Sequence, residues 1–304
     1  MKKDFLTIDD IQRTEILKIF DLAAGLKKKP RGNQLKNKII AFYFEIPSIW
    51  ARMSFETGIK QLSGDSVYLD GSKSVQNAED TTKTLNRYVD AIIGVVRSHD
   101  TLETMSKITD IHVINALSNL SHPCQVLSHL FTIKEKFGDF KELKLAYVGD
   151  GNNICNSLLL GCAKVGMNID VACPNGFEPN SIFIQRAIDY SKISKCDINI
   201  MEDPVKAVKD ANIIYNDTLI GMNDEKEKER RLSVFLPKYQ VNQKLLNYAA
   251  SDVLYMHCLP ANRDEEVTQD VIDGTRSIVW DQAENRLHVQ KALLIKMIGT
   301  KISF

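Results

Sequence analysis

The sequence lacks several features that would assign a protein to a class at once. Its 304 residues contain no run of 18 apolar residues, so no membrane span is expected. The first residues hold no apolar run of signal-peptide length. With 39 basic and 39 acidic residues the formal net charge is zero, which argues against nucleic acid as the main partner. No repeat, low-complexity segment or proline-rich linker is visible.

Cysteine is also sparse, and its spacing excludes the common metal sites. The six cysteines are scattered, without a CxxC pair or a His/Cys cluster. We therefore expect no metal or organic cofactor, and reduced thiols in a cytoplasmic protein.

Apolar runs alternate with helical patterns along the whole chain. Strands are predicted at 37–44, 66–69, 90–96, 143–150, 169–173, 211–215 and 253–257, those at 37–44 and 90–96 of the buried type, with helices that include 53–62 and 156–165. This order predicts an α/β fold with parallel, doubly wound sheets, and the length allows two domains. We expect one domain at 1–135 and a second at 136–285. A final helix at about 286–304 is expected to pack back on the first domain.

The predicted strands end in polar residues. In an open α/β sheet, ligands bind at the carboxyl ends of the strands. Ser48, Asn153, Asp217 and His257 fall at such ends. The charged run at 224–231 is expected to form a solvated helical face with pairs spaced four residues apart.

Six motifs then follow one another in a fixed order. They are the segment 44–56, His-Pro-Cys-Gln at 122–125, Asp-Gly-Asn-Asn at 150–153, the loop 216–223, His-Cys-Leu-Pro at 257–260 and Asp-Gln-Ala-Glu-Asn-Arg at 281–286. In this order the chain resembles the aspartate/ornithine carbamoyltransferase family, and its ornithine branch in particular. The resemblance implies two domains with the active site in the cleft between them, and assembly as a homotrimer. It also implies transfer of a carbamoyl group from carbamoyl phosphate to ornithine, which yields citrulline and phosphate.

The resemblance assigns residues to the carbamoyl end of the donor. His122 and Gln125 would hold its carbonyl and amino groups, and Arg286 would reach the carbonyl oxygen. Attack on the carbamoyl carbon places negative charge on that oxygen, so the chemistry needs donors there. The backbone carbonyl of Leu259 would meet the carbamoyl NH2.

The resemblance also assigns residues to the acceptor amino acid. Asn153 would bind its α-carboxylate and Asp217 its α-ammonium, while Cys258 would lie beside the attacking amine. Met222 matches the methionine of the family's lid loop, although that loop departs from the pattern at Gly221 and Asn223.

The phosphate-binding pattern is broken. The family's Ser-Thr-Arg-Thr-Arg loop reads Ser-Ile-Trp-Ala-Arg here, so Ser48 and Arg52 remain while Trp50 replaces the middle arginine. The position of a second arginine holds Val95, with Arg97 two residues further on. Losing two arginines and two hydroxyls would cost roughly 5 kcal/mol, about a thousandfold in affinity. Within the short loop at 70–77, Lys73 would substitute in part.

Three hypotheses therefore remain open. The first is an ornithine carbamoyltransferase. The second is a divergent transferase that binds an ornithine-like amino acid and takes another donor, for example one that stacks on Trp50. The third is a non-catalytic, ornithine-binding regulatory homologue. All three predict small-molecule ligands, with neither nucleic acid nor membrane as a partner.

Overall fold

The computed structural model describes residues 4–73, 77–221 and 224–300. The chain divides into two compact units: unit 1 comprises 1–131 and 284–304, and unit 2 comprises 132–283. These boundaries lie four and two residues before the limits expected from the sequence at 135 and 285.

Unit 1 is built on a four-stranded sheet in the order β2-β1-β3-β4, with every pair parallel. The strands are β1 (Ile39–Phe44), β2 (Asp65–Asp70), β3 (Ala91–Val95) and β4 (His112–Leu117). Strands β1 and β3 are apolar and buried along almost their whole length, as strands covered on both faces must be.

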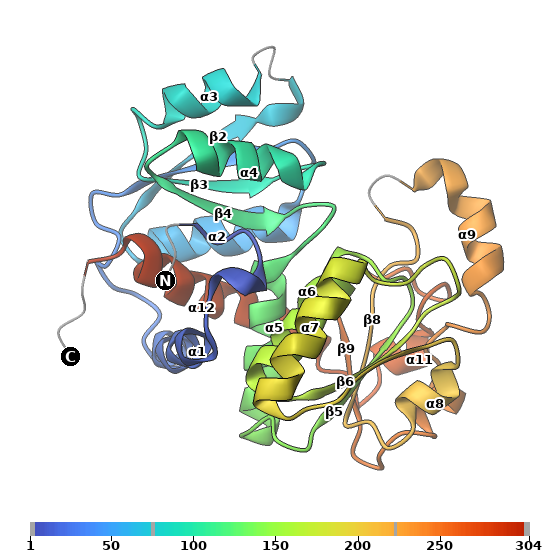
Figure 1. The fold of residues 1–304 in the computed structure, drawn as a ribbon. Helices are drawn as coiled ribbons and strands as arrows, with labels where there is room; N and C mark the ends of the chain where they lie inside the picture. The colour runs from blue at the N-terminus through green and yellow to red at the C-terminus, as the bar shows by residue number, and fades with distance from the viewer. Residues whose placement is uncertain (1–3, 74–76, 222–223, 301–304) are drawn as a thin grey trace. The chain divides into compact units, whose positions relative to one another are not determined.

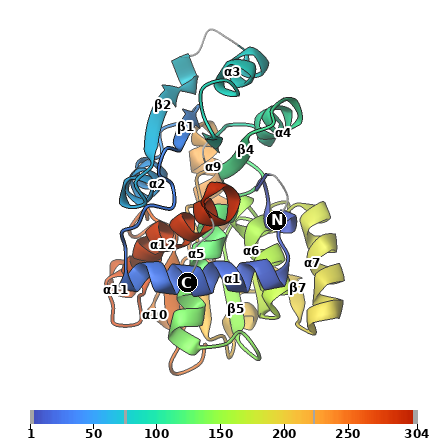
Figure 2. The same cartoon turned by 90° about the vertical axis from the view of Figure 1, so that its left-hand side faces the viewer.

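Helices cover both faces of this sheet (Figure 1). On one face, α3 (Ala78–Leu85) and α4 (His99–Ile108) pack on side chains of the strands through a buried cluster. On the other lies α2 (Ile49–Gln61), beside α12 (Val279–Ile298) (Figure 2). Lys291 of α12 donates a hydrogen bond to Gln61 Oε1 of α2. Unit 1 also holds η1 (Ile8–Asp10), α1 (Arg13–Lys28), η2 (Gly71–Lys73) and the start of α5 (Pro123–Phe137).

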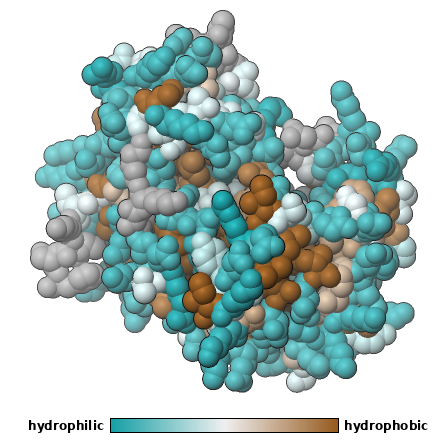
Figure 3. Space-filling view, viewed as in Figure 1, coloured by the Kyte–Doolittle hydropathy of each residue, from teal (hydrophilic) through white to brown (hydrophobic). Residues whose placement is uncertain are grey.

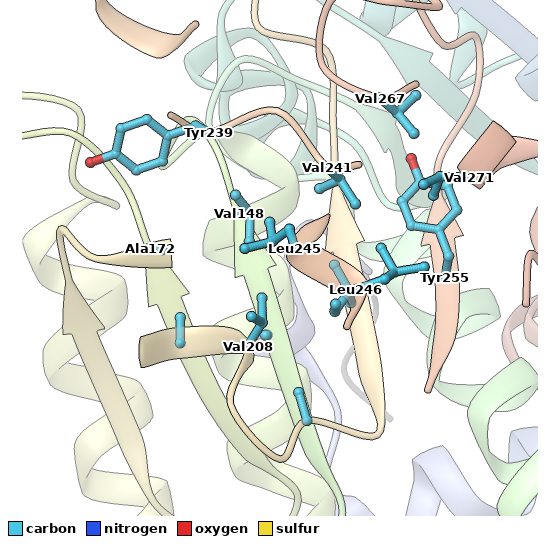
Figure 4. Close-up of a cluster of buried hydrophobic side chains, with 14 of the residues drawn as sticks. Val148, Ala172, Val208, Tyr239, Val241, Leu245, Leu246, Tyr255, Val267 and Val271 are labelled. Atoms are coloured by element: carbon cyan, nitrogen blue, oxygen red, sulfur yellow. The ribbon is translucent and has the colours of Figure 1, made fainter. Parts of the chain in front are cut away.

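Unit 2 is built on a five-stranded parallel sheet in the order β7-β6-β5-β8-β9. The strands are β5 (Lys144–Val148), β6 (Asn168–Ala172), β7 (Ile198–Met201), β8 (Ile213–Asn216) and β9 (Leu254–His257). Helices α6 (Asn153–Val165) and α7 (Ser181–Ser194) lie together on one face. The other face carries α8 (Pro204–Val208), α10 (Gln243–Leu246) and α11 (Gln269–Ile272), packed on the apolar cluster of Figure 4. The remaining elements are η3 (Glu225–Glu227) and α9 (Lys228–Phe235).

The prediction of parallel, doubly wound sheets is therefore confirmed in both units. The helices expected at 53–62 and 156–165 begin earlier, at Ile49 and Asn153, because each starts directly after its N-cap residue, Ser48 or Asn152. Among the described residues no helix is long and apolar enough to cross a membrane. The face drawn in Figure 3 is mainly hydrophilic, with scattered hydrophobic residues.

The strand order defines one switch point in each sheet. In unit 1 the chain runs outward from β1 to β2 and then returns to β3 on the other side of β1, so the order reverses between β1 and β3. In unit 2 the same reversal falls between β5 and β8. Ligands of open α/β sheets bind outside the carboxyl ends of the strands at these points.

Candidate functional site

A buried carboxylate occupies the switch point of unit 2. Asp217 follows β8 directly and is 8% exposed. One of its oxygens accepts a hydrogen bond from Asn152 Nδ2 at 2.8 Å, and the other accepts from Cys258 Sγ at 2.7 Å. The structure thus brings together Asp217 and Cys258, two of the predicted acceptor residues, which lie 41 residues apart in the chain.

The loop after β5 supplies the second side of this group. Asn152 is the N-cap of α6, and its Oδ1 accepts from the backbone N–H groups of Ile154 and Cys155. Asn153, the predicted carboxylate ligand, is the first residue of α6 and is partly buried. Sequence reasoning missed Asn152, although asparagine before a helix is a preferred cap.

A left-handed residue marks the loop after β9. Leu259 has φ of 57° and precedes a cis peptide bond to Pro260. Its N–H donates to His257 Nδ1 at 2.9 Å, so the imidazole proton lies on Nε2, 3.4 Å from Glu266 Oε1. A non-glycine residue in this conformation costs about 1–3 kcal/mol and persists where the surroundings fix it. His257 and Glu266 are both fully buried, and Glu266 belongs to none of the predicted motifs.

A buried arginine fixes the segment that follows Asp217. Arg231 of α9 donates to the carbonyl of Leu219 at 2.7 Å and to the carboxylate of Asp150, and it lies 3.4 Å from Asp224. Burial raises the pKa of Asp150 to about 6, although Arg231 opposes that shift. The expectation of a solvated face at 224–231 is wrong for Arg231, because this side chain turns inward to the loop after β5. Met222 lies outside the described residues.

In unit 1, three of the predicted carbamoyl-end residues are buried together. His122 precedes α5, Gln125 lies in its first turn, and Arg286 projects from α12. Burial and the nearby charge of Arg286 lower the pKa of His122 well below its usual value, so the imidazole is neutral at neutral pH. Gln125 Nε2 lies 2.9 Å from His129 Nε2, while its buried Oε1 makes no hydrogen bond among the described residues. This set offers a positive charge, a neutral imidazole and an amide oxygen that can accept a hydrogen bond.

The altered loop forms the start of α2. Ser48 is the N-cap and makes no side-chain capping bond, and Trp50 is 56% exposed in the first turn. Arg52 pairs with Glu56 at 3.2 Å, and its guanidinium lies 4.2 Å from the centre of the Tyr68 ring. Arg52 is therefore engaged toward the edge strand β2. Of Lys73 the structure describes only the backbone, at the end of η2.

No group of three or more His, Cys, Asp or Glu side chains that could hold a metal ion occurs in residues 4–73, 77–221 and 224–300.

These features define a two-domain, doubly wound α/β protein with polar residues gathered at the carboxyl ends of both sheets. The family model for the carbamoyl-phosphate-binding domain of aspartate/ornithine carbamoyltransferases matches residues 3–135, and the model for the Asp/Orn-binding domain matches 141–297. The chain belongs to the aspartate/ornithine carbamoyltransferase family, on its ornithine branch.

Individual relatives agree with this assignment. Ornithine carbamoyltransferase of Methanocaldococcus jannaschii is 45% identical over 95% of this chain and 96% of its own. That of Archaeoglobus fulgidus is 43% identical over 98% of both chains. The solved ornithine carbamoyltransferase of Pyrococcus furiosus matches with a TM-score of 0.92 at 43% identity, covering 96% of this chain and 95% of the other.

Proposed function

We propose that the protein is an ornithine carbamoyltransferase, which converts carbamoyl phosphate and L-ornithine to L-citrulline and phosphate. Relatives of that name, 43–45% identical over nearly the whole chain, support the proposal. The observation that carries it is the buried carboxylate of Asp217, held by Asn152 and Cys258 at the switch point of unit 2. Such a carboxylate complements the ammonium group of an amino acid.

In this proposal unit 2 binds the acceptor. Asp217 pairs with the α-ammonium, and Asn153 binds the α-carboxylate at the start of α6, where the helix dipole also favours an anion. Cys258 lies beside the δ-amine, its thiol oriented by the 2.7 Å bond to Asp217. Met222 would belong to the lid over this amino acid.

Unit 1 binds the donor in the same proposal. The lone pair of the δ-amine attacks the carbamoyl carbon, a C–N bond forms, and the C–O bond to phosphate breaks. The proton lost from nitrogen leaves with the phosphate. Arg286 and a neutral N–H of His122 stabilise the negative charge that develops on the carbonyl oxygen. The Oε1 of Gln125 accepts from the carbamoyl NH2, while Ser48, Trp50 and Lys73 line the phosphate end.

The assembly and location are further parts of the proposal. We propose a homotrimer in the cytoplasm, acting on small molecules without a cofactor. Exposed apolar side chains in unit 1, at Trp50, Met53 and Val67, support contact between copies. Six free cysteines support a reducing compartment. A solution mass three times that of one chain would test the trimer.

The activity is tested by following citrulline and phosphate release from carbamoyl phosphate and ornithine. Asp217→Asn should raise the KM for ornithine about 10- to 100-fold, because a charged contact contributes about 1.5–3 kcal/mol. Asp189→Asn, on an exposed face of α7, is the matched control and should leave KM unchanged. Absence of citrulline at any substrate level would exclude this function. Stabilisation by ornithine alone would then favour another donor or a sensor.

A further inference from the structure

An exposed arginine lies at the switch point of unit 1. Arg97 follows the end of β3, and its backbone N–H donates to Glu45 Oε2 at 2.8 Å. Glu45 itself follows β1 and donates its N–H to the carbonyl of Val95 at 2.8 Å. These two bonds hold the ends of β1 and β3 together at the point where the strand order reverses, which is where an open sheet binds its ligand.

The guanidinium of Arg97 has no partner in the part of the chain that the structure describes. The side chain is exposed, and no ion pair or hydrogen bond of its guanidinium is found among the described residues. Arg52, the arginine that the sequence motif keeps, is different because Glu56 and Tyr68 already hold it. Val95, at the position of the family's second arginine, is apolar and fully buried.

The local charge increases the need for a cation here. The carboxylate of Glu45 accepts from the Tyr43 hydroxyl at 3.3 Å as well as from the Arg97 N–H. Burial, together with this neighbouring carboxylate, raises the pKa of Tyr43 to about 12. A doubly charged phosphate would be repelled by this carboxylate unless a positive side chain stood beside it.

We propose that Arg97 binds the phosphate group of the carbamoyl donor, in place of the two arginines that the loop and strand β3 no longer supply. This proposal rests on the proposed function, since it concerns the same donor. Arg97 lies at the carboxyl end of β3, as Val95 does. The positive charge therefore stands two residues further along the chain than the arginine that the family has at the position of Val95.

The test compares Arg97→Ala with Arg87→Ala. Arg87 is also exposed but precedes β3, so it lies at the opposite, amino end of the same strand and carries the same charge change. Arg97→Ala should raise the KM for carbamoyl phosphate and the inhibition constant of inorganic phosphate, each about 10- to 100-fold. The KM for ornithine should stay unchanged, and Arg87→Ala should match the native protein.

A second-site variant gives the expected rescue. Trp50 is exposed, so Trp50→Arg should not disturb the core of α2, and in the Arg97→Ala background it should recover most of the lost phosphate affinity. Arg97→Lys should retain part of it, because a lysine keeps the charge but not the bidentate geometry.

The outcomes separate this proposal from the proposed function. Normal turnover by the native protein with equal KM for carbamoyl phosphate in Arg97→Ala and Arg87→Ala would overturn the role of Arg97 alone. If the native protein makes no citrulline, calorimetry with inorganic phosphate decides. Binding that only Arg97→Ala abolishes would support the phosphate site without the reaction. Equal binding, or none to the native protein, would overturn the site.

Discussion

A buried lysine makes the stability of unit 1 dependent on pH in an unusual direction. Lys291 of α12 is fully buried, and its Nζ donates to the carbonyl of Pro30 at 3.0 Å and to Gln61 Oε1 at 2.7 Å. No carboxylate pairs with it in the part of the chain that the structure describes. Burial lowers the pKa of Lys291 from 10.5 to about 8.

The direction follows from proton binding. Between about pH 8 and 10.5 the unfolded chain holds the Lys291 proton and the folded chain has released it, so protons favour unfolding. The group therefore makes the fold more stable as pH rises through this window. The full shift is at most about 3 kcal/mol, and about 2 kcal/mol of it falls between pH 7 and 9.5.

Lys291→Met keeps the length of the side chain and removes the titration. Urea unfolding of native and variant protein should be followed at pH 7 and 9.5, and only the difference between the two proteins used. Cysteines and tyrosines that titrate in the same range then cancel. The free energy of unfolding of the native protein minus that of Lys291→Met should increase by about 2 kcal/mol from pH 7 to pH 9.5. Lys296→Met, exposed on the same helix, should show no such change. A difference independent of pH would refute the assigned pKa.

Two glycine substitutions test the packing in opposite directions. A Cβ on Gly151 would lie 2.2 Å from the backbone nitrogen of Pro179. Gly151→Ala should therefore lower the free energy of unfolding by about 1–3 kcal/mol. It should also raise the KM for ornithine, because the clash displaces the loop that carries Asn152 and Asn153. In α1, Gly25 has nothing within 4 Å of its Cβ position, so Gly25→Ala should increase the free energy of unfolding by about 0.5–1 kcal/mol; urea unfolding and steady-state kinetics check both.

Of the strands in the described residues, the sequence misses β4 and β7, each at an edge of its sheet. Strands such as β1, β5 and β8 are buried on both faces, so each is a continuous apolar run that stands out in the sequence. The edge strand β7 is only partly buried, and its short sequence, Ile198–Met201, carries a polar residue inside it. Nothing in such a segment distinguishes a strand from a loop before its neighbour β6 is known.

Some residues of the candidate site can be predicted from the sequence, and others cannot. Residues inside contiguous motifs, such as His122 and Gln125, can be named from the sequence because their neighbours identify them. Asn152 acts on Asp217 across 65 residues, and Arg231 acts on Asp150 across 81. Those pairings follow from the strand order, which places the loops after β5 and β8 side by side, and the linear pattern does not contain that order.

The altered loop shows which constraints act on each position of α2. Ala51 and Phe55 are fully buried, while Trp50 and Met53 are more than half exposed. Packing therefore fixes the first pair, but it leaves the exposed pair to be set by whatever contacts that end of the helix. An arginine or a tryptophan at position 50 leaves the core unchanged. The choice of side chain at position 50 therefore concerns contact with a ligand or partner. For this reason, Trp50→Arg tests which residue supplies the positive charge that binds the phosphate.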